Sequence, residues 1–274
     1  MAFDWAVLLL TGLTAGILGS VAGLGGGIVV VPALLYFSQV LTVFPHMTPA
    51  IAAGTSFVIV LMTGASSTLS YVRQRRIDYR GGLLFVLGSA PGAWAGAHFS
   101  QFLNPNLFYI LFGMLIITVS LVLRKKDKRG RKQINWKIQR QYTDAAGQQY
   151  DYGYSPFLAV VISFVIGLIG GMFGIGGGSL FVPLMLLLFR FPPHLATATS
   201  MFVIFLSSVA GSATHMLLGN VNWWTLLWLA PGAWIGAMIG AGISRRLSGT
   251  LLITVLQIIF ILLGIRMIFD GVSG

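Results

Sequence analysis

The chain has 274 residues, of which 56% are hydrophobic and only 8% are charged, whereas soluble domains average roughly a quarter charged residues. This composition excludes an ordinary soluble protein. It predicts an all-α protein that crosses a membrane several times, because several uncharged stretches reach the length of about twenty residues that spans a bilayer. Cysteine is absent, which excludes a disulfide framework, a thiolate metal site and a thiol nucleophile.

The net charge of +11 is concentrated in one stretch, where nine basic residues and one acidic residue lie between Arg124 and Arg140. Cytoplasmic loops of membrane proteins carry such an excess, so we expect residues 124–154 to form a basic cytoplasmic loop, soluble and partly disordered. Nucleic-acid binding would need stacking aromatic residues among the basic ones, and only Trp136 is present. We therefore predict no nucleic-acid partner, and expect contact with anionic membrane lipids instead.

A glycine cluster occurs twice. The sequence GLGGGIVVVP runs from Gly23 to Pro32, and GIGGGSLFVP runs from Gly174 to Pro183. No Gly-Lys-Ser/Thr follows either cluster, so neither is a nucleotide-binding phosphate loop. Each cluster lies inside a long hydrophobic segment, which indicates a structural or binding role within the membrane.

Two further matches follow the glycine clusters in the same order. Ala53-Gly54-Thr55-Ser56 corresponds to Thr197-Ala198-Thr199-Ser200, and Pro-Gly-Ala-Trp occurs at 91–94 and again at 231–234. Chance would rarely preserve this order, so the sequence predicts two homologous repeats joined by the basic loop. The predicted repeats are residues 1–123 and 155–274.

The first hydrophobic segment of each half is too long for one straight span. Trp5 to Phe37 comprises 33 residues, which would make a helix of about 50 Å. We expect a helix to about Ala22, an unwound glycine stretch and a short helix from about Ile28, forming a broken or re-entrant unit in each half. Together with the later spans, this gives eight to ten transmembrane segments. The later spans are expected at about 50–72, 81–99, 106–123, 195–218, 223–243 and 251–269.

The positions of lysine and arginine predict the orientation. The cluster Arg73–Arg80 and the basic loop should face the cytoplasm, with the uncharged connection at 100–106 outside. If Arg245 and Arg246 are also cytoplasmic, the second half is inverted relative to the first, and each long first segment begins and ends on one side. We favour this arrangement. The alternative is eight plain spans in two parallel repeats, which places that pair outside.

Unwound backbone at membrane depth is tolerated where it is buried or lines a cavity, and inverted repeats with broken helices are typical of transporters. Glycines let backbone N–H groups approach a ligand, and a helix N-terminus carries roughly half a positive charge. The alternative is packing alone, which we expect for Gly232, Gly236 and Gly240 with their one-per-turn spacing. The candidate anion-binding residues are Gly25, Gly26, Gly27, Gly176, Gly177, Gly178 and Ser179.

All six acidic residues are aspartates, and none lies in the middle of a predicted span. Carriers coupled to cations or protons usually place a carboxylate within the membrane, so its absence favours an anionic solute. No grouping of histidines and carboxylates has the spacing of a metal site, and no metal or cofactor is predicted. The aspartates are Asp4, Asp78, Asp127, Asp144, Asp151 and Asp270.

Paired hydroxyls recur in the two halves, and we predict that Thr55, Ser56, Thr199 and Ser200 donate hydrogen bonds to the solute. Serine and threonine within helices often bond their own backbone instead, so this alternative stays open. His215, which aligns with Tyr71, and His98 are candidates for proton coupling or gating. A packed or interfacial histidine is the alternative for each. The candidate gating residues are His215, His98 and Tyr71.

The paired G-x-G-G-G-x-x-x-x-P, the A-x-T-S and the P-G-A-W motifs resemble those of the TauE/SafE family, over nearly the whole chain except the loop at 124–154. The resemblance implies an α-helical secondary transporter that moves sulfite, thiosulfate or an organosulfonate, and a bacterial or archaeal plasma membrane as its location. The residues themselves indicate only an interior suited to anions.

The predicted function is export of a small sulfur-containing anion by alternating access of the two halves. The alternatives are a non-transporting membrane assembly or scaffold protein and a permease for another small solute. An enzyme is disfavoured, because no pair of nucleophile and base is visible. The oligomeric state is open, with a homodimer as one option.

Overall fold

The computed structural model describes residues 2–40, 47–124, 136–143, 147, 149–244 and 249–273, which are mostly helical. In the first half the helices are α1 (Ala2–Ala22), α2 (Gly27–Val40), α3 (Pro49–Arg73), α4 (Tyr79–Phe99) and α5 (Pro105–Arg124), with a 3-10 turn (Ser100–Phe102) after α4. In the second half they are α6 (Pro156–Phe173), α7 (Gly178–Leu187), α8 (Pro193–Leu217), α9 (Trp223–Ile243) and α10 (Gly249–Ser273).

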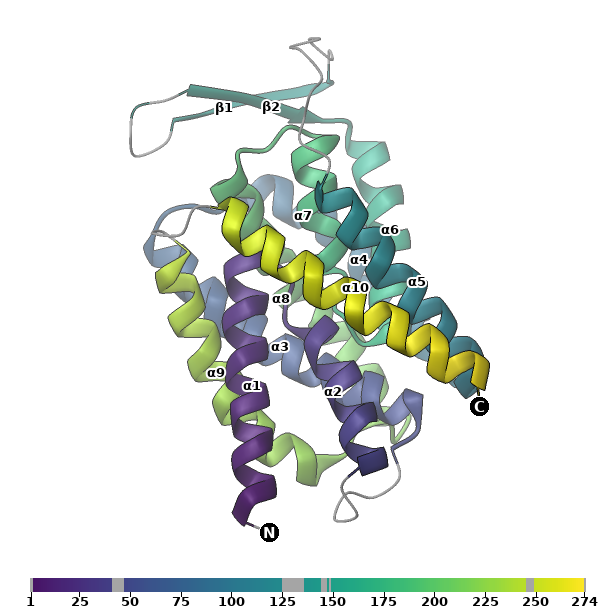
Figure 1. Cartoon of the computed structure of the whole chain (residues 1–274). Coiled ribbons are helices and arrows are strands. Elements are labelled where there is room, and N and C mark those ends of the chain that lie inside the picture. Colours follow the sequence, from purple (N-terminus) through teal and green to yellow (C-terminus); the bar gives the residue numbers. More distant parts are fainter. Residues whose placement is uncertain are drawn as a thin grey trace.

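Both long first segments are broken at their glycine clusters, as the sequence predicts. The first breaks between Ala22 and Gly27, and the second between Phe173 and Gly178. The two halves have the same order of elements, a long helix, a short helix and three long helices. Figure 1 shows that α1 starts at the lower end of the molecule, at the N-terminus, whereas α6 starts at the upper end, beside β2.

The long helices pack across the two halves. The most extensive contacts join α1 to α9, α4 to α6, α5 to α10 and α3 to α8, so the first helix of each half packs against the fourth helix of the other. Glycines make these contacts close. Side chains at Gly12 and Gly16 of α1 would collide with carbonyl oxygens of α9, and Gly232 and Gly236 of α9 have the same relation to α1. The predicted packing role of Gly232 and Gly236 is therefore confirmed.

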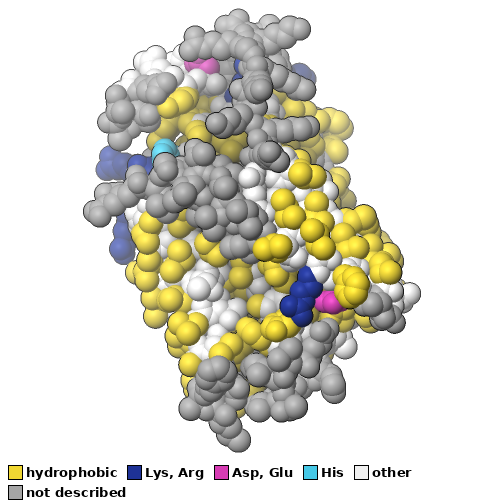
Figure 2. Space-filling model, in the orientation of Figure 1, with side chains coloured by type: hydrophobic (Ala, Val, Ile, Leu, Met, Phe, Trp, Pro, Cys, Tyr) yellow, Lys and Arg dark blue, Asp and Glu magenta, His cyan; other side chains and the backbone are white. Residues whose placement is uncertain are grey.

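Six helices within the described residues are long and apolar enough to cross a membrane, namely α1, α3, α5, α6, α8 and α9. The helices α2 and α7 are apolar but shorter. On the face in Figure 2, apolar side chains cover a broad band of the described surface. These features define a multi-pass membrane protein. Arg245 and Arg246, on which the predicted inversion partly rests, lie outside the described residues.

The second part of the basic loop departs from the irregular structure that the sequence led us to expect. Strands β1 (Ile138–Thr143) and β2 (Gln149–Tyr154) form an antiparallel hairpin in which Arg140 pairs with Tyr152. Exposed and half-buried positions alternate along β1, but most of its residues are polar at both kinds of position. A hydropathy pattern therefore does not predict the strand. The rest of the loop expected to be partly disordered, residues 125–135, 144–146 and 148, lies outside the described residues.

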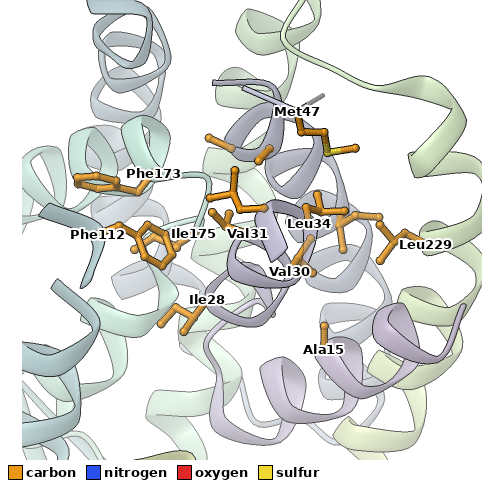
Figure 3. Close-up of a cluster of buried hydrophobic side chains, with 14 of the residues drawn as sticks. Ala15, Ile28, Val30, Val31, Leu34, Met47, Phe112, Phe173, Ile175 and Leu229 are labelled. Atoms are coloured by element: carbon orange, nitrogen blue, oxygen red, sulfur yellow. The ribbon is translucent and has the colours of Figure 1, made fainter. Parts of the chain in front are cut away.

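The largest apolar cluster surrounds the short helix α2. Figure 3 shows Ile28 and Val31 of α2 near Phe112, Phe173 and Ile175, which come from α5, α6 and the second glycine cluster. All five side chains belong to the same cluster. The short helix of the first half therefore packs against residues of both halves, with Phe173 and Ile175 coming from the second.

We predict that Gly232→Ala destabilises the protein, because the new methyl group would collide with the backbone carbonyl of Leu9 on α1. Overpacking of this kind costs about 1–3 kcal/mol. Gly242→Ala on the same helix is the control, since nothing lies within 4 Å of the position that its methyl group would take. Thermal unfolding in detergent should show a lower midpoint for Gly232→Ala only; equal midpoints would contradict the close α1–α9 contact.

Candidate functional site

The two breaks have the same backbone conformation. We name residues 23–27 the first glycine loop and residues 174–178 the second glycine loop. Within each, the glycines at the first, third and fourth positions have positive φ, between +67° and +82°. Side chains rarely tolerate this left-handed region, which glycine adopts freely. The repeated glycines therefore specify one turn geometry twice.

The two loops touch each other through their backbones. A methyl group at Gly27 would lie 2.7 Å from the Cα atom of Ile175, and one at Gly178 would lie 2.7 Å from the carbonyl oxygen of Leu24. Real side chains do not approach this closely. Because Gly27 begins α2 and Gly178 begins α7, the N-termini of the two short helices meet at this contact.

Two apolar side chains close the loops on the side of α3 and α8. A methyl group at Gly25 would lie 3.1 Å from Val60 and 3.4 Å from Ile204, and Gly176 is in contact with the same two side chains. Both Val60 and Ile204 are fully buried. Val60 is the fifth residue after Thr55, and Ile204 is the fifth residue after Thr199. Aligning the two Thr-Ser motifs and reading on along both sequences would therefore have paired them.

The predicted serines bind the loops, each in the opposite half. Ser56 of α3 donates to the carbonyl of Gly174 at 2.8 Å, and Ser200 of α8 donates to the carbonyl of Gly23 at 2.9 Å. A hydroxyl has one proton to donate. In this conformation the two serines therefore position the loops, and neither has a free donor for a solute.

The predicted threonines bind the ends of neighbouring helices. The hydroxyl of Thr55 accepts from the backbone N–H of Asn222 at 2.8 Å, and that of Thr199 accepts from the N–H of Asp78 at 3.1 Å. Asn222 and Asp78 are the N-caps of α9 and α4. Both threonines are fully buried. Thus each Thr-Ser pair connects a glycine loop to a helix cap, a relation that sequence spacing alone does not reveal.

The start of each short helix retains unused donors. Among the described contacts, the N–H groups of Gly27 and Gly178 have no acceptor. Ser179 is fully buried, and its hydroxyl oxygen also has no partner. Leaving buried polar groups unpaired costs about 1–3 kcal/mol each, so such groups call for a functional explanation. Together with two helix dipoles, these donors favour a negative charge.

Two of the three predicted gating residues, Tyr71 and His215, contact the helices just before the loops. The hydroxyl of Tyr71 donates to the carbonyl of Ser20 at 3.0 Å, and Nε2 of His215 lies 2.9 Å from the carbonyl of Gly171. A carbonyl only accepts, so Nε2 carries the proton, and Nδ1 of this buried ring has no partner. Among the described contacts, His98 bonds within its own helix, to the carbonyl of Trp94 at 3.0 Å.

The described residues contain no group of three or more His, Cys, Asp or Glu side chains that could hold a metal ion. The site is instead built from backbone amides, hydroxyls and apolar side chains. Two broken helices whose N-termini meet within a bundle of apolar spanning helices define a membrane transporter.

Comparison with known proteins agrees with this class. The family model described as Sulfite exporter TauE/SafE matches residues 8–267, and the chain belongs to this family. Probable membrane transporter protein YunE of Bacillus subtilis is 46% identical over 270 residues, which cover 98% of this chain and 99% of that protein.

More distant relatives have similar descriptions. Probable membrane transporter protein ORF9 of Sinorhizobium sp. is 27% identical, over 97% of this chain and 92% of its own length. Probable membrane transporter protein MJ0441 of Methanocaldococcus jannaschii is 24% identical, over 77% of this chain and 72% of its own length. No solved structure gives a significant match.

We predict that Ser56→Ala and Ser200→Ala each lower the free energy of unfolding by about 1 kcal/mol, because each removes a buried hydrogen bond between the halves. Ser208→Ala is the control, since its hydroxyl bonds only the carbonyl of Phe205 in its own helix. Thermal unfolding in detergent measures the difference. Equal behaviour of all three variants would mean that the serines do not position the loops.

Proposed function

We propose that this membrane transporter is a secondary transporter for a small anion, which binds where the N-termini of α2 and α7 meet. The observation that carries the proposal is the combination of unpaired N–H groups at Gly27 and Gly178 with the unpaired, buried hydroxyl of Ser179. The two N–H groups can only donate hydrogen bonds to a ligand, and the hydroxyl can donate one as well. An oxyanion has the complementary acceptors.

The charge distribution supports an anion over a cation. Asp78 is the described acidic residue that lies closest in sequence to the Thr-Ser motif of α3. Its carboxylate accepts a hydrogen bond from the N–H of Gly81 and caps α4. A cation at the glycine loops would face two positive helix ends without a compensating carboxylate. The family description, sulfite exporter, supports a sulfur oxyanion such as sulfite or thiosulfate, or an organosulfonate, as the solute.

We further propose that the halves are inverted repeats that alternate in exposing the site. In this structure Thr55, Ser56, Thr199 and Ser200 are all fully buried, so transport requires the halves to move. The reciprocal bonds across the halves support a symmetric movement, in which one serine–loop contact opens while its counterpart holds. His215 is the candidate for proton coupling, because its Nδ1 atom is free to accept a proton.

We predict that Ser179→Ala reduces sulfite or thiosulfate flux several-fold in reconstituted vesicles, because it removes a donor that has no structural partner. Its melting temperature should not fall, because the substitution removes a buried hydroxyl that has no hydrogen-bond partner. Ser163→Ala is the matched control, as Ser163 is also buried and unpartnered but lies within α6, outside the glycine loops.

Two results would contradict this function. Equal flux in Ser179→Ala and Ser163→Ala would remove Ser179 from the site. No protein-dependent flux of sulfite, thiosulfate or sulfoacetate, with Gly26→Val and Gly177→Val merely unfolding the protein, would favour the scaffold alternative. Flux of a different solute would favour a permease of other specificity.

We propose a plasma-membrane location with the hairpin end in the cytoplasm. Arg140 on β1 contacts Asp78, which puts the hairpin at the same end as the Arg73–Arg80 cluster. The stretch from Arg124 to Arg140 that leads into the hairpin carries nine basic residues, and such an excess of positive charge is typical of the cytoplasmic side. The chain has no native cysteine, so single cysteines report position cleanly. In intact cells, a membrane-impermeant maleimide should label Gln101→Cys but not Gln149→Cys; the reverse result would overturn the orientation. Both positions are exposed, and both should react after lysis.

A further inference from the structure

The hairpin lies over the connection between α7 and α8 at the upper end of the molecule (Figure 1). The N–H of Gly153 donates to the carbonyl of Phe189 at 3.2 Å. The ring of Tyr152 lies 4.4 Å from that of Phe191, and the ring of Trp136 lies 5.6 Å from that of Phe189. The hairpin is therefore packed onto the end of the second broken helix, in a single aromatic cluster.

An ion pair fixes the hairpin to α4. Nη1 of Arg140 lies 2.8 Å from Oδ1 of Asp78, whose side chain is only 3% exposed while that of Arg140 is 28% exposed. The hydroxyl of Tyr152 donates to the other carboxylate oxygen at 3.2 Å. Burial, followed by the charge of Asp78, raises the pKa of Tyr152, so the phenol keeps its proton and remains a donor. The carboxylate also accepts from Gly81 at 3.1 Å and thereby caps α4.

The same aspartate is connected to the glycine loops. Its backbone N–H donates to Thr199, and the neighbouring Ser200 donates to the carbonyl of Gly23 in the first glycine loop. Arg140 on the hairpin is thus connected to the first glycine loop through Asp78, Thr199 and the adjacent Ser200.

The other half has a neutral version of this path. Asn222 caps α9 in the place where Asp78 caps α4, and its N–H donates to Thr55 beside Ser56. Asn222 carries no charge, and β1 and β2 are the only strands within the described residues. The N-cap of α4 is therefore tied to a strand by an ion pair, whereas the equivalent N-cap of α9 has no charged contact among the described residues.

We propose that the hairpin, residues 138–143 and 149–154, is a gate that closes the hairpin end of the substrate site through the Arg140–Asp78 ion pair. The inference rests on the proposed function, since it concerns access to the same site. In this structure the gate is closed. Opening toward the hairpin end requires Arg140 and Asp78 to separate, which leaves a buried carboxylate without its partner and therefore disfavours that state. The opposite end has no such charged closure among the described contacts.

The test uses the double variant Asp78→Asn with Arg140→Gln. Asparagine is a good N-cap and is the residue that the second half uses at Asn222, so the change removes both charges while keeping the cap. Ala198→Cys, a fully buried position on α8 beside Thr199, reports access from the hairpin end. Ala52→Cys, equally buried on α3, reports access from the other end.

We expect the double variant to raise the rate of maleimide labelling at Ala198→Cys about tenfold in inside-out vesicles, with no rise at Ala52→Cys, because a population shift exposes one end only. Gln141→Ala, on the exposed face of β1, is the control and should leave both rates unchanged. Tyr152→Phe keeps the ring and loses one bond to Asp78, and a smaller rise of about threefold is expected.

A labelling rate at Ala198→Cys within about twofold of the parent in both hairpin variants would overturn the gate, provided that one of them elutes and melts as a folded protein. Tyr152→Phe keeps the test valid if the double variant unfolds. Labelling needs no solute, so a gate that responds in a protein without anion flux would refute the proposed function and leave the gate in place. Anion flux with unchanged labelling would refute the gate and leave the proposed function in place.

Discussion

The contact that the rest of the structure depends on is the backbone-to-backbone meeting of the two glycine loops. A side chain at Gly27 or Gly178 would force the loops apart, because even a methyl group would overlap the backbone of the opposite loop. This contact brings the positive ends of α2 and α7 together, which is unfavourable by itself. Hydrogen bonds from Ser56 and Ser200 to the loop carbonyls hold the arrangement, and a bound anion would offset the repulsion. In the proposed function, the same contact both stabilises the fold and favours a negatively charged solute.

Much of this arrangement could be predicted from the sequence, and particular residues show where prediction ends. The breaks near Ala22 and Ile28 follow from glycine placement and from the length of a membrane span, both local properties. The partners of Thr55 and Ser56 could not be predicted, because they lie in the other half and depend on how helices pack. The hairpin escaped because its strands are polar, so the burial of Tyr154 depends on an aromatic surface distant in sequence.

The two halves are alike at the centre and unlike at the ends. Val60 and Ile204 cover both loops, and the Thr-Ser pairs form equivalent bonds. Three of the differences lie at or near the described contacts: Ser179 stands where the first half has Ile28, His215 where it has Tyr71, and Asp78 where the second half has Asn222. In the proposed function, these unequal positions are where the two halves offer different chemical groups to the solute and to the ends of the site.

The packing of α1 against α9 has a consequence for biosynthesis. The helix α1 is synthesised long before α9, yet its glycine face is completed only when α9 packs against it. Until then the carbonyls and small residues around Gly12 and Gly16 face lipid or a membrane insertase. The same holds for α4 until α6 is inserted, but for a much shorter stretch of chain. We therefore expect the N-terminal helix to be the part of the protein whose assembly is slowest and most dependent on assistance during insertion.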